Sequence, residues 1–383
     1  MTELDQLRQT KAKQYARISR RLWILSTVFG GAYLVVWLLA GRGPALKAWL
    51  LERATWFGNP WLMVAGFALV FGGIYFLMGL PIAYYRGFVL PHRFEQSTQP
   101  LEGWIIDQLK GLAVGAPIGL LLLELLYAAL RAAGELWWLW AAAGLLVFNV
   151  LLSNLAPVLI MPIFNKYVPL GEDHRELAER LLALAKGAGT RVQGVYKFDM
   201  SRRTKSANAA LTGIGNTRRI VLGDTLIEEF TPDEIETILA HELGHHVHRD
   251  IPVLIAFGSI STAVGLFLAS LAMRWAVGAF GFTGVADVAA LPALAAVLGL
   301  YGILTMPLDN AVSRWREGMA DEYALHSTGK SQAFASAFVR LANQNLAEVD
   351  PEKWVVWLFY SHPPLGKRIE AAGQWKAAGS QAD

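Results

Sequence analysis

The chain has 383 residues, of which 54% are hydrophobic and only 17% are charged. Soluble domains carry roughly 25% charged residues, so this balance indicates a membrane protein. The absence of cysteine excludes disulfides, thiolate nucleophiles and cysteine-ligated zinc, and the net charge of +3 gives no reason to expect nucleic-acid binding.

Six apolar stretches are long enough to cross a hydrocarbon core, which takes about 20 helical residues. The first follows a 21-residue tail and lacks a convincing cleavage site, so we interpret it as an uncleaved anchor. A further run at 354–360 is too short to span and fits a core helix or an interfacial segment. The predicted spans are 22–40, 62–85, 112–130, 136–160, 251–276 and 291–306.

Basic residues sort by side across these six spans. With the N-terminus inside, 29 of the 34 Lys and Arg residues fall on one side of the membrane and 5 on the other. Because cytoplasmic loops are enriched in Lys and Arg, we expect both termini and both large polar segments in the cytoplasm. The predicted fold class is mainly α: a polytopic membrane protein of about six transmembrane helices with a cytoplasmic α+β domain.

The character of the chain changes near residue 160. Residues 1–160 are predicted to form an N-terminal transmembrane region of four spans, and residues 161–383 a second region that the last two spans interrupt. In the second region, β-like runs at 206–214 and 219–222 flank Gly-Asn-Thr, a pattern that predicts a hairpin. An amphipathic helix precedes them, with apolar residues at helical spacing: Leu177, Leu181, Leu182 and Leu184.

The stretch LAHELGHHVHRD, residues 239–250, carries the strongest chemical signal. It lies in a predicted helix that starts at Thr231, because Thr231 and Glu234 form a capping box. His241 and His245 are four residues apart and therefore lie on one helix face, the spacing that a zinc site requires. Glu242 lies about 100° around the helix, where it can take a proton from a zinc-bound water as general base.

A chance match of this short motif is the alternative, and its position in a capped helix just before a span argues against it. His246 and His248 are interpreted as solvated or supporting groups, and Asp250 as the residue that ends the helix at the membrane surface. We therefore predict one Zn²⁺ per chain.

A catalytic zinc needs a third protein ligand and an open fourth position. The best candidate is Glu317 in SRWREGMADEYAL, because two antiparallel spans return this segment to the side of the histidines. Asp321, one turn later, is predicted to accept a ring N–H from a ligating histidine. In the alternative, Glu317 and Asp321 form surface pairs with Arg314 or Arg316.

Two further segments fit peptide hydrolysis. KSANAALTG reads as a strand with small side chains, and an open sheet edge of this kind can pair with an extended peptide. SHPPLGKRIE offers His362 and Arg368 as donors to an oxyanion. Each has a plainer interpretation, as an ordinary hairpin strand and as surface residues at a helix start.

Together these segments resemble the type I CAAX prenyl endopeptidase family, gluzincin-like zinc metalloendopeptidases of membranes with bacterial-type members. SANAALTG, HELGHHVHRD, SRWREGMADEYAL and SHPPLGKRIE are similar to its active-site blocks and follow the same order. LPIAYYRGFVLPHRFEQSTQPLEGWIIDQLK and APVLIMPIFNKYVPL resemble its membrane-exit segments. Segment 86–110 departs from the family pattern, and eukaryotic members carry an additional N-terminal span.

The resemblance implies a role for each candidate residue. It implies zinc on His241, His245 and Glu317, Asp321 supporting a ligand, Asn208 and Ala209 on a substrate-binding strand, and Glu242, His362 and Arg368 in catalysis. It also implies a helical barrel around a large chamber, a peptide or protein substrate with a lipidated C-terminus, and, for a bacterial-type member, the inner membrane.

Two alternatives to a prenyl protease stay open. A heat-shock-type quality-control endopeptidase shares the same blocks but acts on unprenylated membrane proteins. A transporter or scaffold with a structural metal fits less well, because intramembrane charges are expected along a transport path and Glu124 is the main one here.

Overall fold

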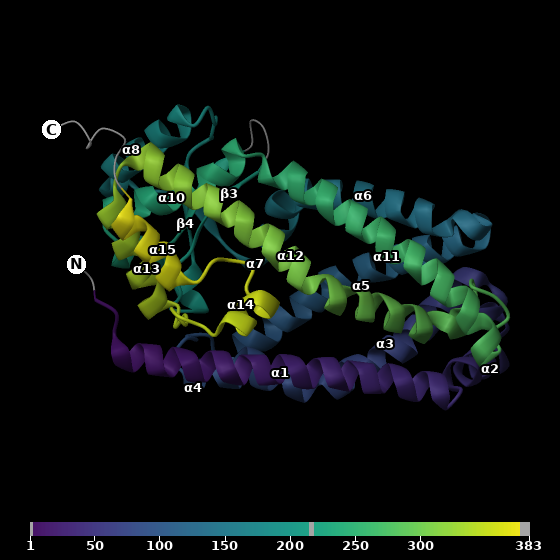
Figure 1. Cartoon of the computed structure of the whole chain (residues 1–383). Helices are drawn as coiled ribbons and strands as arrows, with labels where there is room; N and C mark the ends of the chain where they lie inside the picture. Colours follow the sequence, from purple (N-terminus) through teal and green to yellow (C-terminus); the bar gives the residue numbers. More distant parts are fainter. Residues whose placement is uncertain (1–2, 214–217, 376–383) are drawn as a thin grey trace.

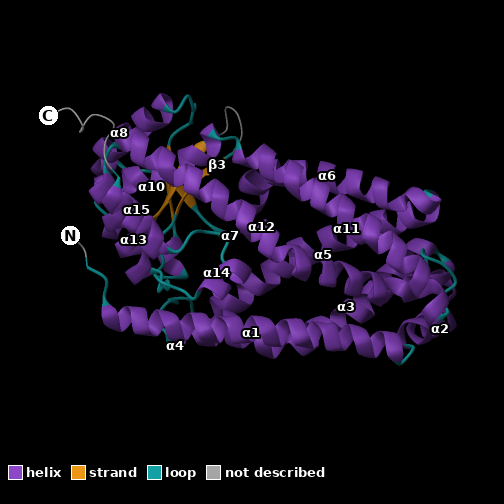
Figure 2. Cartoon of the chain, in the orientation of Figure 1, coloured by secondary structure: helices purple, strands orange, loops and turns teal. Residues whose placement is uncertain are grey.

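The structure, a computed structural model, describes residues 3–213 and 218–375 of an elongated, mainly helical molecule (Figures 1 and 2). Among those residues, six helices are long and apolar enough to cross a membrane, which confirms the predicted number of spans. The helices extend beyond the apolar runs, and the first begins at Gln6 rather than at residue 22. The membrane-spanning helices therefore reach into the polar domain at one end of the molecule.

The first 164 residues contain seven described α-helices. They are α1 (Gln6–Leu39), α2 (Arg42–Arg53), α3 (Pro60–Tyr84), α4 (Leu90–Arg93), α5 (Leu101–Ala132), α6 (Trp137–Leu155) and α7 (Met161–Phe164). A π-helical turn joins α3 to α4, and another joins α6 to α7, so that each pair of helices forms one continuous rod.

The rest of the chain combines eight described α-helices with a small sheet. The helices are α8 (Arg175–Gly187), α9 (Asp224–Glu229), α10 (Pro232–Val247), α11 (Asp250–Phe280), α12 (Leu291–Thr328), α13 (Ser331–Gln344), α14 (Lys353–Phe359) and α15 (Leu365–Gln374). The strands are β1 (Tyr167–Pro169), β2 (Val195–Phe198), β3 (Ala209–Thr212) and β4 (Arg219–Gly223).

The four strands form one sheet in the order β1-β2-β4-β3. β3 and β4 pair antiparallel, as predicted, with Ala209 opposite Leu222. The predicted Gly-Asn-Thr turn between them lies outside the described residues. β2 joins β4 in parallel and β1 flanks β2, two short strands that the sequence does not predict. This order leaves β3 at one edge of the described sheet.

The helix α8 packs on this sheet as the spacing of its leucines predicts, with one exception. Leu177 and Leu181 are buried together with residues of β2, β4 and α10. Leu182 is exposed, contrary to expectation, because one residue advances about 100° around a helix and carries the side chain off the buried face.

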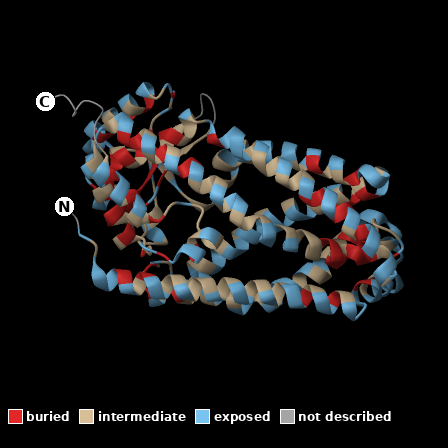
Figure 3. Ribbon diagram, in the orientation of Figure 1, coloured by how far each residue is buried: buried red, intermediate tan, exposed pale blue. Residues whose placement is uncertain are grey.

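Most buried residues lie at the two ends of the molecule (Figure 3). At one end, α8, α9 and α10 cover the sheet. At the other end, α1, α3, α5, α6, α11 and α12 share a core with Trp37, Phe67 and Trp137. Between these cores few residues of the spans are buried. In the most apolar window of the span Gly134–Phe164, none of the residues is buried. The large chamber that the resemblance implies stays a prediction.

Candidate active site

The helix α10 begins with the predicted capping box. The side chain of Thr231 accepts a hydrogen bond from the Glu234 amide (3.3 Å), and the Glu234 carboxylate accepts one from the Thr231 amide (2.8 Å). Ile235, Leu239 and Leu243 point into the core over the sheet. With one face fixed in this way, the helix presents His241 and His245 on its other side.

The helix α12 passes close to α10 beside these histidines. At Gly244 a Cβ atom would lie 2.9 Å from the Ala320 Cα atom and 3.1 Å from its carbonyl oxygen, so glycine is what permits this approach. The spans α11 and α12 leave and return to the same end of the molecule (Figure 1), and the return brings Glu317 next to His241 and His245.

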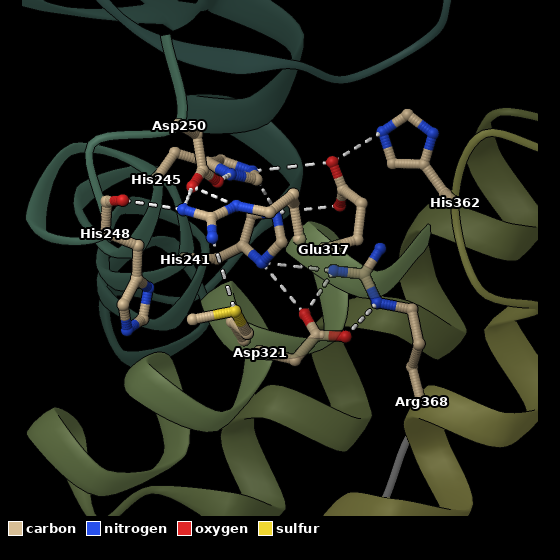
Figure 4. A network of polar contacts seen from close by, with 10 residues as sticks. His241, His245, His248, Asp250, Glu317, Asp321, His362 and Arg368 are labelled. Carbon is tan, nitrogen blue, oxygen red and sulfur yellow. Dashed lines mark hydrogen bonds and ion pairs between the residues drawn. The ribbon is translucent and has the colours of Figure 1, made fainter. Parts of the chain in front are cut away.

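His241, His245 and Glu317 form a compact group of potential metal ligands. Each offers one ligand atom, and the three atoms lie within 4.8 Å of one another. The two histidine Nε2 atoms are 3.2 Å apart, and the Glu317 oxygens lie 3.3 Å from Nε2 of His241 and 3.5 Å from Nε2 of His245 (Figure 4). The predicted spatial convergence across 72 residues of sequence is therefore observed.

Carboxylates on the outer side of the rings orient both histidines. Nδ1 of His241 lies 2.8 Å from Oδ1 of Asp321, and Nδ1 of His245 lies 2.6 Å from Oδ2 of Asp250. An Nδ1–H donated to each carboxylate leaves the Nε2 lone pairs facing one another and Glu317. Oε2 of Glu317 is buried and has no hydrogen-bond partner among the described residues. Three converging acceptors of this kind fit a cation.

The groups around His241 also favour a positive charge at this place. Burial by itself would lower the pKa of this imidazole, but the carboxylates of Asp321 and Glu317 outweigh it and raise the pKa to about 9. When no metal is bound, the His241 imidazole is therefore protonated at neutral pH, and this proton supplies the positive charge that a metal ion would bring.

Glu242 borders the histidine pair without joining it. Its side chain lines a cavity that opens beside the histidines, and no described residue donates a hydrogen bond to its carboxylate. Burial raises the pKa of Glu242 above its usual value, while the neighbouring histidines oppose that shift. The carboxylate is therefore free to exchange a proton with a molecule in the cavity.

The C-terminal segment supplies His362 and Arg368, which approach the site in different ways (Figure 4). Nε2 of His362 lies 3.2 Å from Oε1 of Glu317, and its side chain is 58% exposed. Arg368 is buried, and its guanidinium pairs with Asp321 and lies 3.9 Å above the Phe338 ring. Both residues line the cavity, as an oxyanion donor must, and their catalytic roles stay predictions.

Asp250 has a larger role than ending α10, which corrects our expectation. It opens α11, holds His245 and forms a buried ion pair with Arg316 of α12, which also donates to the His248 carbonyl (2.6 Å). The alternative that Glu317 pairs with Arg316 is therefore wrong. In the sequence, the only sign of this role is an acidic residue five positions after His245. Its partner Arg316 is 66 residues away, so no local pattern marks the ion pair.

A cavity of about 610 Å³ opens beside the candidate ligands. Asn208 and Ala209 line it together with Glu242, so the predicted peptide-binding strand and the predicted base share one space. Further lining residues come from α1, through Tyr15 and Ser19, and from residues 345–348 after α13. The sequence gives no sign that the first helix contributes to the site.

Comparison with known proteins decides the family. The protein-family model described as "Peptidase family M48" matches residues 172–376. A second protein-family model, described as "CAAX prenyl protease N-terminal, five membrane helices", matches residues 2–166. The chain belongs to peptidase family M48.

Relatives of this M48 peptidase match it over almost its whole length. The "Uncharacterized metalloprotease YhfN" of Bacillus subtilis is 31% identical over 94% of this chain and 84% of its own. "CAAX prenyl protease 1" of Saccharomyces cerevisiae is 30% identical over 96% and 86%. The crystal structure of S. mikatae Ste24p superposes with a TM-score of 0.76 and 25% identity, covering 96% of this chain and 89% of that one.

The family, the spans and the ligand cluster together establish the class of protein. The M48 peptidase is a multi-pass membrane metalloendopeptidase that acts on a peptide or protein substrate. Its His-His-Glu cluster is suited to a metal ion.

Proposed function

We propose that the M48 peptidase holds one Zn²⁺ between His241, His245 and Glu317. Two imidazoles and one carboxylate form a ligand set found in catalytic zinc sites, which keep a fourth position for water or substrate. The observation that carries the proposal is the convergence of two Nε2 atoms on a buried Glu317 carboxylate, whose Oε2 atom has no hydrogen-bond partner among the described residues. When bound, zinc supplies a Lewis acid that lowers the pKa of water from 15.7 to about 7.

Residues of the chain would transfer the proton, bind the peptide and stabilise the oxyanion. Glu242 accepts a proton from the attacking water and later donates it to the departing amine. A peptide lies along β3 at Asn208 and Ala209, which line the same cavity. His362 and Arg368 donate hydrogen bonds to the carbonyl oxygen as it gains negative charge.

Asp321 would position two of these groups at once. Its carboxylate lies against Nδ1 of His241 and pairs with the Arg368 guanidinium. A carboxylate that fixes the tautomer of a ligating histidine increases metal affinity. We therefore assign Asp321 to orienting His241 and Arg368, not to binding zinc.

We propose a lipidated C-terminal peptide as the substrate. The support is that the yeast relative, which is named a CAAX prenyl protease, matches this chain over 96% of its length. The cavity also presents apolar side chains, among them Phe338, Leu346 and Phe359. The alternative, a quality-control endopeptidase, would accept unprenylated proteins equally well.

We further propose that the protein lies in the inner membrane of a bacterial cell and that its active site is on the cytoplasmic side. Both described ends of the chain lie at the same end of the molecule as the candidate ligands (Figure 1). The excess of Lys and Arg falls on that side of the spans, as the positive-inside rule requires of a cytoplasmic face.

The deciding experiment offers the purified full chain one peptide in prenylated and unprenylated forms. We expect zinc-dependent cleavage of the prenylated form, read from product masses and abolished by a chelator. Glu242→Gln is the matched control, because it should keep zinc and lose about 10²- to 10⁴-fold in rate. Equal cleavage of both peptides would favour the quality-control function, and cleavage by Glu242→Gln at the wild-type rate would refute the mechanism.

A further inference from the structure

β3 lies at one edge of the described sheet, and Asn208 and Ala209 at this edge line the cavity. The main-chain hydrogen-bonding groups of β3 point alternately toward β4 and away from it. The Gly223 amide donates to the Asn208 carbonyl (2.9 Å) across the β3–β4 pair. In antiparallel strands, residues whose main chain bonds the partner alternate with residues whose main chain faces away. Residues 208, 210 and 212 therefore face β4, while residues 207, 209 and 211 face the opposite side.

Just before β3, main-chain groups on the side that faces away from β4 already form hydrogen bonds within the protein. The Thr98 amide donates to the Arg203 carbonyl (3.2 Å), and the Lys205 amide donates to the Gln96 carbonyl (3.2 Å). The Gln344 side chain donates to the Lys205 carbonyl (2.9 Å). Segment 86–110, whose role the sequence leaves open, thus closes part of this edge through Gln96 and Thr98.

Asn345 ends the series at Ala207. Its Oδ1 atom accepts the Ala207 N–H (2.8 Å), and its Nδ2 atom donates to the Ala207 carbonyl (3.2 Å). An amide side chain that satisfies both main-chain groups takes the place of the next peptide unit of an added strand. In the described part of the chain, no hydrogen bond reaches the outward-facing groups of Ala209 and Leu211.

The backbone holds Asn345 firmly in this place. Its amide bonds the Leu341 carbonyl at the end of α13 (2.8 Å). The next residue, Leu346, is buried and has a left-handed backbone (φ 51°), which turns the chain along the cavity wall. Residues 345–348 and Tyr15 of α1 line the cavity on this side.

We infer that Asn345 is a stop for the substrate strand and thereby a specificity-determining residue. A bound peptide pairs with Ala209 and Leu211, and its main-chain pairing ends where Asn345 holds Ala207. Antiparallel pairing is the more stable arrangement per residue, so the C-terminal side of the peptide points toward Asn345. The distance from the cleaved bond to the end of pairing is then set by Asn345. This inference rests on the proposed function, which lays the peptide along β3.

The test uses prenylated peptides that share one cleavage site and differ by single residues at the C-terminal end, with a second series extended at the N-terminal end. For the wild-type chain, kcat/KM should stop rising at one length in the C-terminal series. Asn345→Ala should shift that limit and raise the relative kcat/KM of the next longer peptide about fivefold, the worth of one net hydrogen bond. An unmoved limit in the active variant would overturn the stop, and a limit in the N-terminal series would overturn its direction.

Two controls separate this inference from the chemistry. Gln344→Ala removes a neighbouring hydrogen bond to Lys205 and should leave the length limit in place. Asn345→Ser is too short to hold both Ala207 groups and provides a second variant if Asn345→Ala does not fold. The same length series, measured as binding of fluorescent peptides to Glu242→Gln with and without Asn345→Ala, needs no cleavage. A limit that moves there supports the stop even where the proteolytic proposal fails, and a limit that stays refutes it.

Discussion

Nδ1 of His245 lies 2.6 Å from Oδ2 of Asp250, the residue with which α11 begins. The other carboxylate oxygen of Asp250 pairs with Arg316, which α12 carries back from the far end of the molecule. All three side chains are wholly or partly buried, so the contact is shielded from water. A candidate metal ligand is in this way held by the first turn of one span and the last turns of another.

Removing this carboxylate should therefore weaken metal binding without removing a ligand. We expect Asp250→Asn to lower zinc affinity about 10- to 100-fold, the usual effect of losing a carboxylate behind a ligating histidine. Competition with a chromophoric chelator measures the affinity, and thermal unfolding of the metal-free chain reports any general loss of structure. Wild-type affinity in the variant would show that Asp250 does not orient His245.

The third ligand can be tested by composition rather than by activity. Glu317→Ala should lower bound zinc well below one per chain and abolish cleavage, because two histidines alone hold zinc poorly. Elemental analysis of the purified chain gives the zinc content. Glu322→Ala, an exposed position on the same helix, should keep full occupancy. Equal zinc in the two variants would exclude Glu317 from the site.

The close approach of α10 and α12 should depend on the missing side chain at residue 244. A Cβ atom there meets Ala320 at 2.9 Å, so Gly244→Ala must push the helices apart. We expect a loss of about 1 to 3 kcal/mol in stability, with weaker zinc binding as His245 moves from Glu317. Gly318→Ala is the matched control, because a Cβ atom there meets nothing within 4 Å. Similar melting temperatures for both variants would contradict the packing argument.

A cluster of charges ties α8, α10 and the start of α13, and it should make stability depend on acid. Lys330 Nζ lies 2.8 Å from Oε2 of Glu236, which also pairs with Arg180. Burial by itself raises the pKa of Glu236, but the two cations outweigh it and lower the pKa below the usual 4.5. Ionised Glu236 therefore stabilises the fold above pH 4.5, and this contribution disappears as the pH falls through the lowered pKa.

Glu236→Gln should then cost about 1 kcal/mol at pH 7 and nothing at a pH below the lowered value. Thermal unfolding of the detergent-solubilised chain at both pH values measures the difference. Asp173→Asn, at an exposed position outside this cluster, is the control. A difference between wild type and Glu236→Gln that persists in acid would show that the pair does not act through its charge.

The sequence by itself determined the features that depend on neighbours along the chain. Six spans follow from the length of apolar runs, and the start of α10 follows from the capping box of Thr231 and Glu234. The i, i+4 spacing of His241 and His245 places both rings on one face without further information. Order along the chain also gave Glu317, because two spans must return it to the side they left.

Only the tertiary structure decided which distant groups meet. Asp250 reads as a helix end until Arg316 is placed beside it, and Leu182 fits the apolar pattern of α8 but misses the sheet. The pairing of Asn345 with Ala207 joins residues 138 apart, and no local pattern marks it. The physical reason is that helix and turn signals act over one or two turns, whereas hydrogen bonds between elements depend on how whole helices pack.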